Sequence, residues 1–554
     1  MTGFRSTTLH VIWLIPIAII SCYFSILDPE WHHDGILFKP AVDVASGLSL
    51  FRETFTQYGA LTTYLQAGAI YLFGKALIVL RLQAALFFIL IGVFNLLILR
   101  RLIPLWLAVS STYVWFLMAP IFLLPFLAWS SIYALFFTTV GVWFLVRSIE
   151  SQTSVRRCLW FCFWSGVAMA GGFWARQPVG IVFSTTFLFF IVNYFDLSTP
   201  KKCRLLQPFS YVLGFLVSHL LMLTWLFFDE ALGDWWTQSI LAAHTFAEMV
   251  PNGLSVANIF YYLFPSPNHV YLGNNSDIWR LMPLFTLVAT VCTVFLFFLY
   301  ETKRHQSKVL LALSLAAIGS WHQYFPVPDI GHMFWAATPM IGITITSVYF
   351  LGCSVGIGRK GVVVFVFLFI VFVFGPDITY RINAGKSKVP IGTLYLPTLK
   401  GMMVTSHHIA AQRYEGTPES YRNEFEVLTE TLSRVRRLNN DLSLVTFTPD
   451  VYLTTEFRSI NPHKIHVWWP WLFRFYPERE EQIINFIETQ RPLIEVATVK
   501  WDSHDWSDPT DSARKRFGFS DYEVLISLNY ADWGSTQLLA APELMKRYKE
   551  FYGN

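Results

Sequence analysis

Residues 28–74 read DPEWHHDGILFKPAVDVASGLSLFRETFTQYGALTTYLQAGAIYLFG. This polar stretch carries acids and aromatic rings, and it directly follows an apolar run at 9–27. A polar segment in this place is typical of an extramembrane loop after a first transmembrane helix. Asp34 then lies beside the bilayer, between two histidines and a glycine. An ionisable group there is poorly placed for apolar packing, so the stretch is a candidate for chemistry at the membrane surface.

The composition assigns most of the chain to lipid. Of its 554 residues, 54% are hydrophobic and only 14% are charged, whereas soluble chains have about 25% charged residues. No basic stripe stands apart from the predicted membrane-flanking loops, so no nucleic-acid partner is expected. Phosphate-binding Gly-rich loops, zinc spacings and a nucleophile elbow are absent from the sequence, which argues against ATP-driven pumping and serine hydrolysis.

Apolar runs of spanning length predict an α-helical polytopic membrane protein with about eleven transmembrane helices. The run at 9–27 reads as a retained anchor rather than a cleaved signal peptide, because it is long and lacks a small-x-small site. The predicted spans are 9–27, 78–99, 103–119, 126–146, 158–175, 179–194, 209–228, 281–300, 309–320, 333–351 and 362–374.

Basic residues mark alternate loops between these spans, at 100–101, 147–157, 201–204, 303–308 and 359–360. The positive-inside rule places those loops in the cytoplasm. The loop at 28–75, the long loop at 229–280 and the C-terminal region then share the outer face. This clustering of polar segments predicts a site on the outer side of the membrane.

The last part of the chain predicts a second, soluble domain. We expect a polytopic domain at 1–376, with its outer loop at 28–75, and a small α/β domain at 377–554 on the outer face. Amphipathic helices are predicted at 421–438 and 478–490, and strands at 442–447, 493–499 and 524–528. The segment 377–418 reads as a linker or irregular segment.

Asp34 is the leading candidate for chemistry. A carboxylate in this loop can accept a proton from an attacking hydroxyl, which is general-base catalysis. The alternative is that Asp34 caps a short interfacial helix, and the residues alone leave both open. His33 and Tyr58 are candidate substrate contacts. Two adjacent histidines cannot easily share one ion, so no cofactor or metal is expected, although a divalent metal stays open.

Further motifs follow in order: YGALTTY at 58–64, LFG at 72–74, LRLQ at 80–83 opening the next span, and the arginine pair at 100–101 that ends it. With the acidic loop before them, they resemble the GT-C superfamily of integral membrane glycosyltransferases, which holds the protein O-mannosyltransferases and the bacterial aminoarabinose transferases. The resemblance implies that Asp34 matches the loop aspartate that acts as catalytic base. It also implies a lipid-linked sugar donor, usually a polyprenyl phosphate.

Two arginines are candidates for the donor phosphate. Arg176 lies in WARQPVG at 174–180, a tight connection between two spans at the outer face. Its planar fork suits phosphate oxygens, while the alternative is an interfacial arginine that snorkels to water. Arg81 has a similar case.

A third candidate region is the hairpin WHQYFPVPDIGH at 321–332. It brings His322, Asp329 and His332 to the side of Asp34. His332 could donate a hydrogen bond to donor phosphate, with Asp329 and His322 as further substrate contacts. The alternative is a structural Asp–His pair that fixes the turn.

These features favour an inverting glycosyltransferase that moves a sugar from a polyprenyl-phosphate donor to a hydroxyl of a glycan, lipid or protein acceptor. A glycolipid transporter or flippase without covalent chemistry is the alternative. Its expected signs are duplicated halves and charges at mid-membrane, whereas the charges here lie mostly at span ends. The bacterial character of the resemblance implies the inner membrane, with the site on the periplasmic side.

Overall fold

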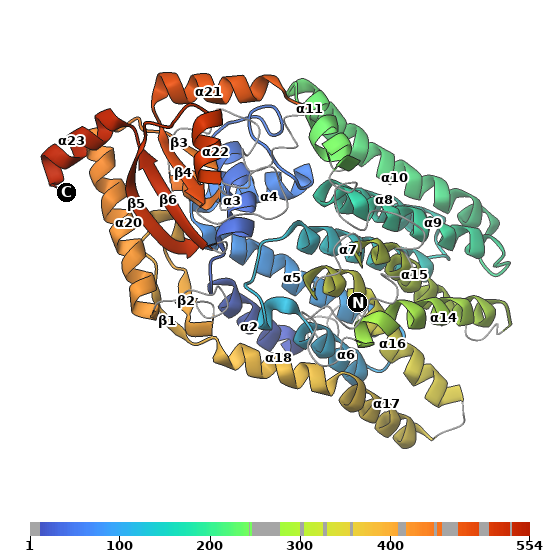
Figure 1. Ribbon diagram of the computed structural model, residues 1–554. Coiled ribbons are helices and arrows are strands. Elements are labelled where there is room, and N and C mark those ends of the chain that lie inside the picture. The colour runs from blue at the N-terminus through green and yellow to red at the C-terminus, as the bar shows by residue number, and fades with distance from the viewer. Residues whose placement is uncertain are drawn as a thin grey trace.

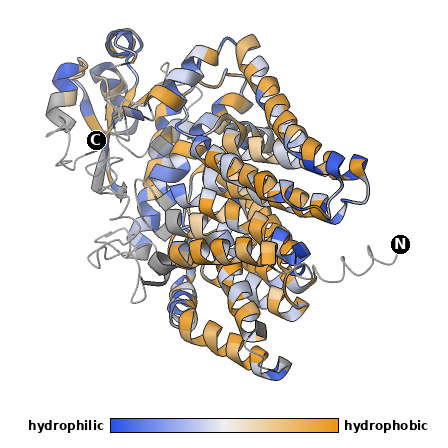
Figure 2. Cartoon of the chain, turned by 90° about the vertical axis from the view of Figure 1, so that its right-hand side faces the viewer, coloured by the Kyte–Doolittle hydropathy of each residue, from blue (hydrophilic) through white to orange (hydrophobic). Residues whose placement is uncertain are grey.

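A computed structural model describes residues 12–242, 244–245, 277–299, 304–324, 330–354, 358–407, 417–447, 451–456, 475–497, 509–531 and 534–553. Long helices dominate the molecule, and a small mixed sheet lies at one side of it (Figure 1). Hydrophobic residues cover the long helices, while hydrophilic residues gather over the C-terminal part and at helix ends (Figure 2). The predicted fold class is therefore confirmed: an α-helical polytopic membrane protein with a small α/β part.

Each predicted span overlaps one helix of the bundle. These helices are α2 (Ile15–Ser25), α5 (Leu77–Leu99), α6 (Leu105–Leu117), α7 (Ser130–Glu150), α8 (Val155–Ala175), α9 (Ile181–Tyr194), α10 (Lys201–Phe228), α14 (Asp277–Leu299), α15 (Arg304–Ser320), α16 (Ile330–Ser354) and α17 (Arg359–Val373). Among the described residues, seven helices are long and apolar enough to cross a membrane. The number rises to eight if α17 and α18 (Gly375–Ser387), which meet at 54°, form one span. The count of about eleven stays a prediction.

Basic residues of different predicted cytoplasmic loops form ion pairs at the ends of the helices. Arg101 at the end of α5 pairs with Glu150 at the end of α7, Nε to Oε1 at 3.1 Å. Arg304 at the start of α15 pairs with Asp196 just after α9, Nη1 to Oδ1 at 3.3 Å. Basic loops far apart in the sequence therefore meet at one end of the bundle. Arg176, at the opposite end of α8, lies on the side where the polar site is built.

Residues 28–75 form α3 (Trp31–Ala45) and α4 (Ala60–Phe73). Most of α3 is buried, so it is not the exposed surface helix that its charges suggest. Its Lys39 and Asp43 are 6% exposed and pair one helical turn apart, Nζ to Oδ1 at 2.5 Å. The Thr54 hydroxyl also donates to Asp43, at 2.7 Å. Pairing and hydrogen bonding make burial of these charges tolerable.

The C-terminal part carries the predicted α/β pattern. Its four-stranded sheet has the order β3-β4-β6-β5, with β3 parallel to β4 and the other pairs antiparallel. The strands are β3 (Leu444–Phe447), β4 (Leu493–Ala497), β5 (Glu523–Ala531) and β6 (Gly534–Ala540), and the helices are α20 (Pro418–Leu438), α21 (Glu478–Gln490), α22 (Pro509–Arg516) and α23 (Pro542–Tyr552). We call residues 390–553 the C-terminal module.

The segment expected to be a linker is largely ordered. It contains α18, then β1 (Pro390–Thr393) paired antiparallel with β2 (Met403–Thr405), with the short helix η8 (Pro397–Leu399) between the strands. In Figure 1, α18 runs from α17 toward β1 and β2, beside α2. The connection is therefore packed against the membrane bundle. The boundary at 376/377, which falls within α18, stays a prediction.

Close backbone approach between α8 and α10 depends on two glycines. A Cβ on Gly166 would collide with the carbonyl oxygen of Tyr211, and one on Gly214 would collide with that of Phe163. Only a residue without a side chain lets the two helices pack at this distance, a common device in membrane helix pairs.

We predict that Gly166→Ala lowers the thermal midpoint of the detergent-solubilised protein, because α8 and α10 must move apart. The expected loss is about 1–3 kcal/mol, the usual cost of overpacking. Gly68→Ala in α4 is the matched control, since a Cβ there meets nothing within 4 Å. Equal midpoints for Gly166→Ala and wild type would contradict the glycine contact.

Candidate functional site

The first turn of α3 is held by two carboxylates of the segment DPEWHHD. Glu30 is the N-cap residue, and its side chain accepts the backbone N–H of His33 at 2.5 Å. In return, Asp34 Oδ2 accepts the backbone N–H of Glu30 at 2.8 Å. This reciprocal arrangement satisfies donors that a helix N-terminus otherwise leaves open. Asp34 therefore caps the helix, as the alternative reading of the sequence proposed.

Asp34 also forms a buried ion pair with Arg81 of α5. The two side chains are 1% and 0% exposed, and Arg81 Nε donates to Asp34 Oδ1 at 3.1 Å while Nη2 pairs with Oδ2. The guanidinium also donates to the carbonyl of Leu27 at 2.5 Å and to that of Asp28 at 2.9 Å. Burial raises the pKa of Asp34, and the charge and hydrogen bonds of Arg81 oppose that rise.

This geometry differs from what the sequence suggested for both residues. Asp34 was expected to face the outer water as a base, and Arg81 to contact a donor phosphate. Instead, the two side chains form an ion pair with each other, and both are buried. Either role would require the ion pair to open, and an isolated buried charge is costly.

A more open polar cluster lies on the other side of the same turn. Glu30 is 13% exposed and His33 is 35% exposed, with His33 Nδ1 3.1 Å from Glu30 Oε2. The His33 ring lies 5.2 Å from that of Trp129, edge to face. Trp129 Nε1 in turn donates to the Tyr58 hydroxyl at 2.9 Å. We call Glu30, His33, Tyr58, Trp129 and Arg176 the outer polar cluster.

Tyr58 connects the acidic and the basic sides of this cluster. Burial raises the pKa of Tyr58, the indole of Trp129 opposes the rise, and the charges of Arg176 and Glu30 both act on the hydroxyl with opposite sign. Arg176 is half-buried and donates to the Ser131 hydroxyl at the start of α7. Contacts thus lead from Glu30 through His33 and Trp129 to Tyr58, and Arg176 bonds to Ser131 two residues from Trp129.

His322 borders Arg176 from a third direction. It lies in η7 (Trp321–Tyr324), which packs against η3 (Gln177–Gly180) next to Arg176. Its Nδ1 is 2.7 Å from the Gly319 carbonyl. Burial, with a smaller contribution from the Arg176 charge, lowers the pKa of His322 to about 4. The Nε2 atoms of His322 and Gln177 are buried without a hydrogen-bond partner among the described residues.

The structure thus brings Arg176, Tyr58, His33 and His322 to one region. Asp34 and Arg81 do not join them, because the two form a buried ion pair with each other. Asp329 lies outside the described residues, as does the side chain of His332 in α16. Glu30, Trp129 and Ser131 also belong to this region, although no sequence pattern predicted them as site residues. Glu30 directly precedes α3 and completes DPE, so its place at a helix N-terminus was the available signal.

Metal ligands do not gather in the described part of the chain, where no group of three or more His, Cys, Asp or Glu side chains has suitable geometry.

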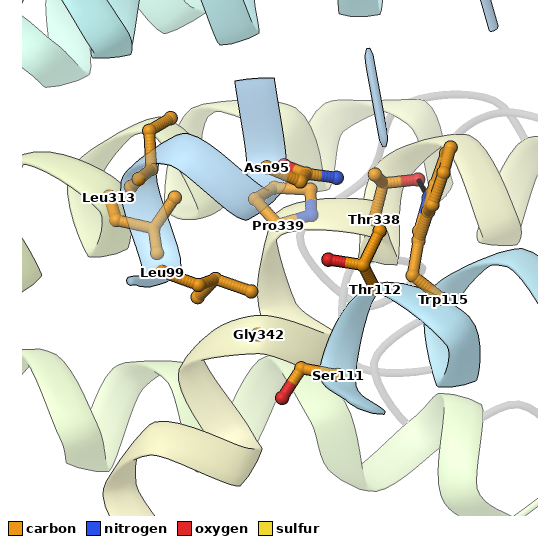
Figure 3. Close-up of a pocket in the computed structure, with 10 residues that line it drawn as sticks. Asn95, Leu99, Ser111, Thr112, Trp115, Leu313, Thr338, Pro339 and Gly342 are labelled. Atoms are coloured by element: carbon orange, nitrogen blue, oxygen red, sulfur yellow. Dashed lines mark hydrogen bonds between the residues drawn. The ribbon is translucent and has the colours of Figure 1, made fainter. Parts of the chain in front are cut away.

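A small cavity lies elsewhere in the bundle and is not part of this site. It measures about 10 Å³, and its lining comes from α5, α6, α15 and α16. Figure 3 shows Asn95, Thr112 and Thr338 at its wall, with the Trp115 indole bonded to Thr338 at 3.2 Å. Its volume suits a single water molecule. Asn95 and Arg81 are both on α5, about 21 Å apart along its axis.

Comparison with solved structures identifies the fold. ArnT from Cupriavidus metallidurans in the apo state aligns over 97% of this chain and 99% of its own, with TM-score 0.53 and 11% identity. The same ArnT bound to undecaprenyl phosphate aligns over 96% and 98%, with TM-score 0.50 and 12% identity. The apo Archaeoglobus fulgidus oligosaccharyltransferase aligns less well, with TM-score 0.40 and 11% identity over 76% of this chain, which spans 59% of that longer protein.

The chain therefore has a fold like that of ArnT, over nearly the whole length of both chains. No protein-family model matches the sequence, and no curated protein does.

We predict that Asp34→Asn destabilises the protein by about 3–5 kcal/mol, because it leaves the buried Arg81 charge without its partner. Thermal unfolding in detergent measures the effect. Asp229→Asn is the control, since Asp229 is a partly buried aspartate that accepts the Ser49 hydroxyl at 2.6 Å. A stable Asp34→Asn variant would contradict the structural importance of the ion pair.

His322 predicts a specific pH dependence of stability. Its folded pKa of about 4 lies below the ordinary 6.5, so the unfolded chain takes up a proton first as the pH falls. The free energy of unfolding therefore decreases between about pH 6.5 and pH 4, at up to about 1.4 kcal/mol per pH unit. Thermal midpoints of His322→Gln should fall less steeply over this range than those of wild type. Parallel curves would show that His322 is not held neutral.

Proposed function

We propose that this protein is an inverting membrane glycosyltransferase that moves a sugar from a polyprenyl-phosphate carrier to a hydroxyl of a glycan, lipid or protein acceptor. One observation carries the proposal: at one end of the bundle, side-chain contacts lead from the carboxylate of Glu30 through His33 and Trp129 to Tyr58, and Arg176 bonds to Ser131 two residues from Trp129. These are the two charges that such a transfer needs, one to take a proton and one to stabilise a leaving phosphate.

Arg176 is the proposed contact for the donor phosphate. Its guanidinium is half-buried at the C-cap of α8, where it can present several donors to phosphate oxygens. The unpartnered Nε2 atoms of Gln177 and His322 lie on segments that adjoin it. A neutral His322 with its proton on Nδ1 would offer Nε2 as an acceptor, so it suits a sugar hydroxyl better than phosphate. The solved complex of ArnT with undecaprenyl phosphate supports this donor class.

Glu30 is the proposed base, with Asp34 as the residue that positions it. Asp34 holds the Glu30 backbone N–H and is itself fixed by Arg81. In the transfer, the acceptor oxygen bonds to the anomeric carbon as the bond from that carbon to the phosphate oxygen breaks. The acceptor proton passes to the Glu30 carboxylate, and the bonding electrons leave with the polyprenyl phosphate near Arg176. A single displacement of this kind inverts the anomeric configuration.

The proposed location is a bacterial inner membrane with the outer polar cluster on the periplasmic side. The basic loops that meet at the far end of the bundle support that orientation, because such loops stay in the cytoplasm.

We predict that Glu30→Gln lowers kcat by about 10²–10⁴-fold, the usual contribution of a general base, without weakening the binding of undecaprenyl phosphate. Turnover would be measured in nanodiscs as release of undecaprenyl phosphate from a panel of undecaprenyl-phosphate sugars. Glu230→Gln is the control, because the Glu230 side chain is an outer-face carboxylate that is 80% exposed. Full activity of Glu30→Gln would reject the assignment. Movement of the sugar-lipid across the membrane without any product would favour a flippase.

Arg176→Gln is expected to weaken undecaprenyl phosphate binding by about 10–100-fold, which corresponds to a lost charge-assisted hydrogen bond of about 1.5–3 kcal/mol. Titration of the nanodisc-embedded protein with undecaprenyl phosphate measures this. Arg157→Gln is matched to it, since Arg157 is exposed near the opposite end of the same helix. Equal affinities for the two variants would place the phosphate elsewhere.

A further inference from the structure

The chain just before α3 is paired with the C-terminal module as if it were an extra strand. The Asp28 N–H donates to the Met403 carbonyl at 2.7 Å, and the Met403 N–H donates to the Ile26 carbonyl at 2.8 Å. Leu27 thereby forms an isolated parallel bridge with Met403 of β2. Two segments more than 370 residues apart in the chain thus share backbone hydrogen bonds just before the first turn of α3.

The Asp28 side chain adds a second tie to β2. Its Oδ1 accepts the backbone N–H of Thr405 at 2.8 Å, and its Oδ2 accepts the Thr405 hydroxyl at 3.0 Å. Asp28 is 1% exposed and Thr405 is fully buried. Asp28 also has a left-handed backbone, with φ of 53°. That conformation is uncommon for a residue with a side chain, and the Thr405 and Arg81 contacts hold it in place.

These contacts lead directly to Glu30, two residues further on. From the membrane side, Arg81 holds the carbonyls of Leu27 and Asp28 and, through Asp34, the Glu30 backbone. From the other side, β2 holds Asp28. The position of the Glu30 carboxylate is therefore set by two bodies, the helix bundle and the C-terminal module.

Aromatic packing adds further contacts between the start of α3 and the C-terminal module. Trp31, the first residue of α3, is 1% exposed and stacks on Phe425 of α20 at 4.9 Å. It also meets Tyr452 edge to face at 5.1 Å. The residue after Glu30 is thus enclosed by side chains of the module.

We propose that Asp28 and Thr405 are positioning residues, through which the C-terminal module orients Glu30 for proton transfer. Both are buried where the chain before α3 pairs with β2. The inference rests on the proposed function, because it concerns the base of that reaction. The inference goes beyond the proposed function because it gives the C-terminal module a role in orienting the catalytic base.

Thr405→Val tests this in the full chain in nanodiscs, because it removes the hydroxyl and keeps the β-branched shape. We expect kcat to fall about 10-fold or more, since small misplacements of a catalytic group are costly, while undecaprenyl phosphate binds as in wild type. Thr405→Ser restores the hydroxyl and should restore kcat. Asp28→Asn should reproduce the loss, and the double variant should be no worse than either single one, because both remove the same contact.

Leu539→Ala is the control for a purely structural effect. Leu539 is a fully buried residue of β6 in the core of the module's sheet, where it pairs with Ile494 of β4 and Val524 of β5. If Leu539→Ala lowers the thermal midpoint at least as much as Thr405→Val does but keeps kcat, the positioning role is supported. If the two variants lose activity in proportion to stability, it is overturned.

A reporter that does not depend on turnover separates this inference from the proposed function. His33→Cys, at the 35% exposed His33 position, should react faster with a water-soluble maleimide when combined with Thr405→Val, because the first turn of α3 is released. An unchanged rate overturns the positioning role while leaving Glu30 as base. A fully active Glu30→Gln overturns the proposed function and the inference with it.

Discussion

Arg81 is a fully buried guanidinium on a membrane helix, and the start of α3 is arranged so that the hydrogen bonds of this guanidinium are satisfied. Two carbonyls of the chain before α3 and the carboxylate of Asp34 supply acceptors to it. A buried charge without such partners would cost several kcal/mol. The first turn of α3 is therefore fixed against α5. The residues that precede this turn are hydrogen-bonded to β2 of the C-terminal module. The outer polar cluster takes its shape from this constraint.

Two carboxylates four residues apart consequently have different environments. Asp34 is buried, and it forms an ion pair with Arg81 and accepts the backbone N–H of Glu30 at the start of the helix. Glu30 is partly exposed beside His33. The same chemical group can serve as a structural anion or as a proton acceptor, and burial and neighbours decide which. The resemblance selected Asp34 as the aspartate of the loop, but position in the chain does not report which face of the turn a side chain occupies.

The C-terminal module is joined to the bundle at several points rather than by one linker. The bridge to β2, the Asp28–Thr405 bonds and the stacking of Trp31 on Phe425 all act on the start of α3. Tyr476 of the module also reaches Asp234 in the outer loop at 3.2 Å. A site assembled from both parts has its geometry set by their packing, which is consistent with a fold shared with ArnT over the length of both chains.

The sequence by itself determined the local structure of this protein. Hydropathy located the bundle helices, because lipid demands long apolar runs. Amphipathic periodicity located α20 and α21, and β-branched runs located β3, β4 and β5, whereas β6 went unpredicted. The sequence also raised a capping role for Asp34, since capping is a matter of neighbouring residues.

Only the tertiary structure decided which side chains meet. Arg81 and Asp34 are 47 residues apart in the chain, Trp129 and Tyr58 are 71 apart, and Thr405 and Asp28 are 377 apart. Hydropathy and propensity are sums over short windows, so they carry no information about such partners. The burial that makes Asp34 structural and leaves Glu30 accessible arises when helices from distant parts of the chain pack together.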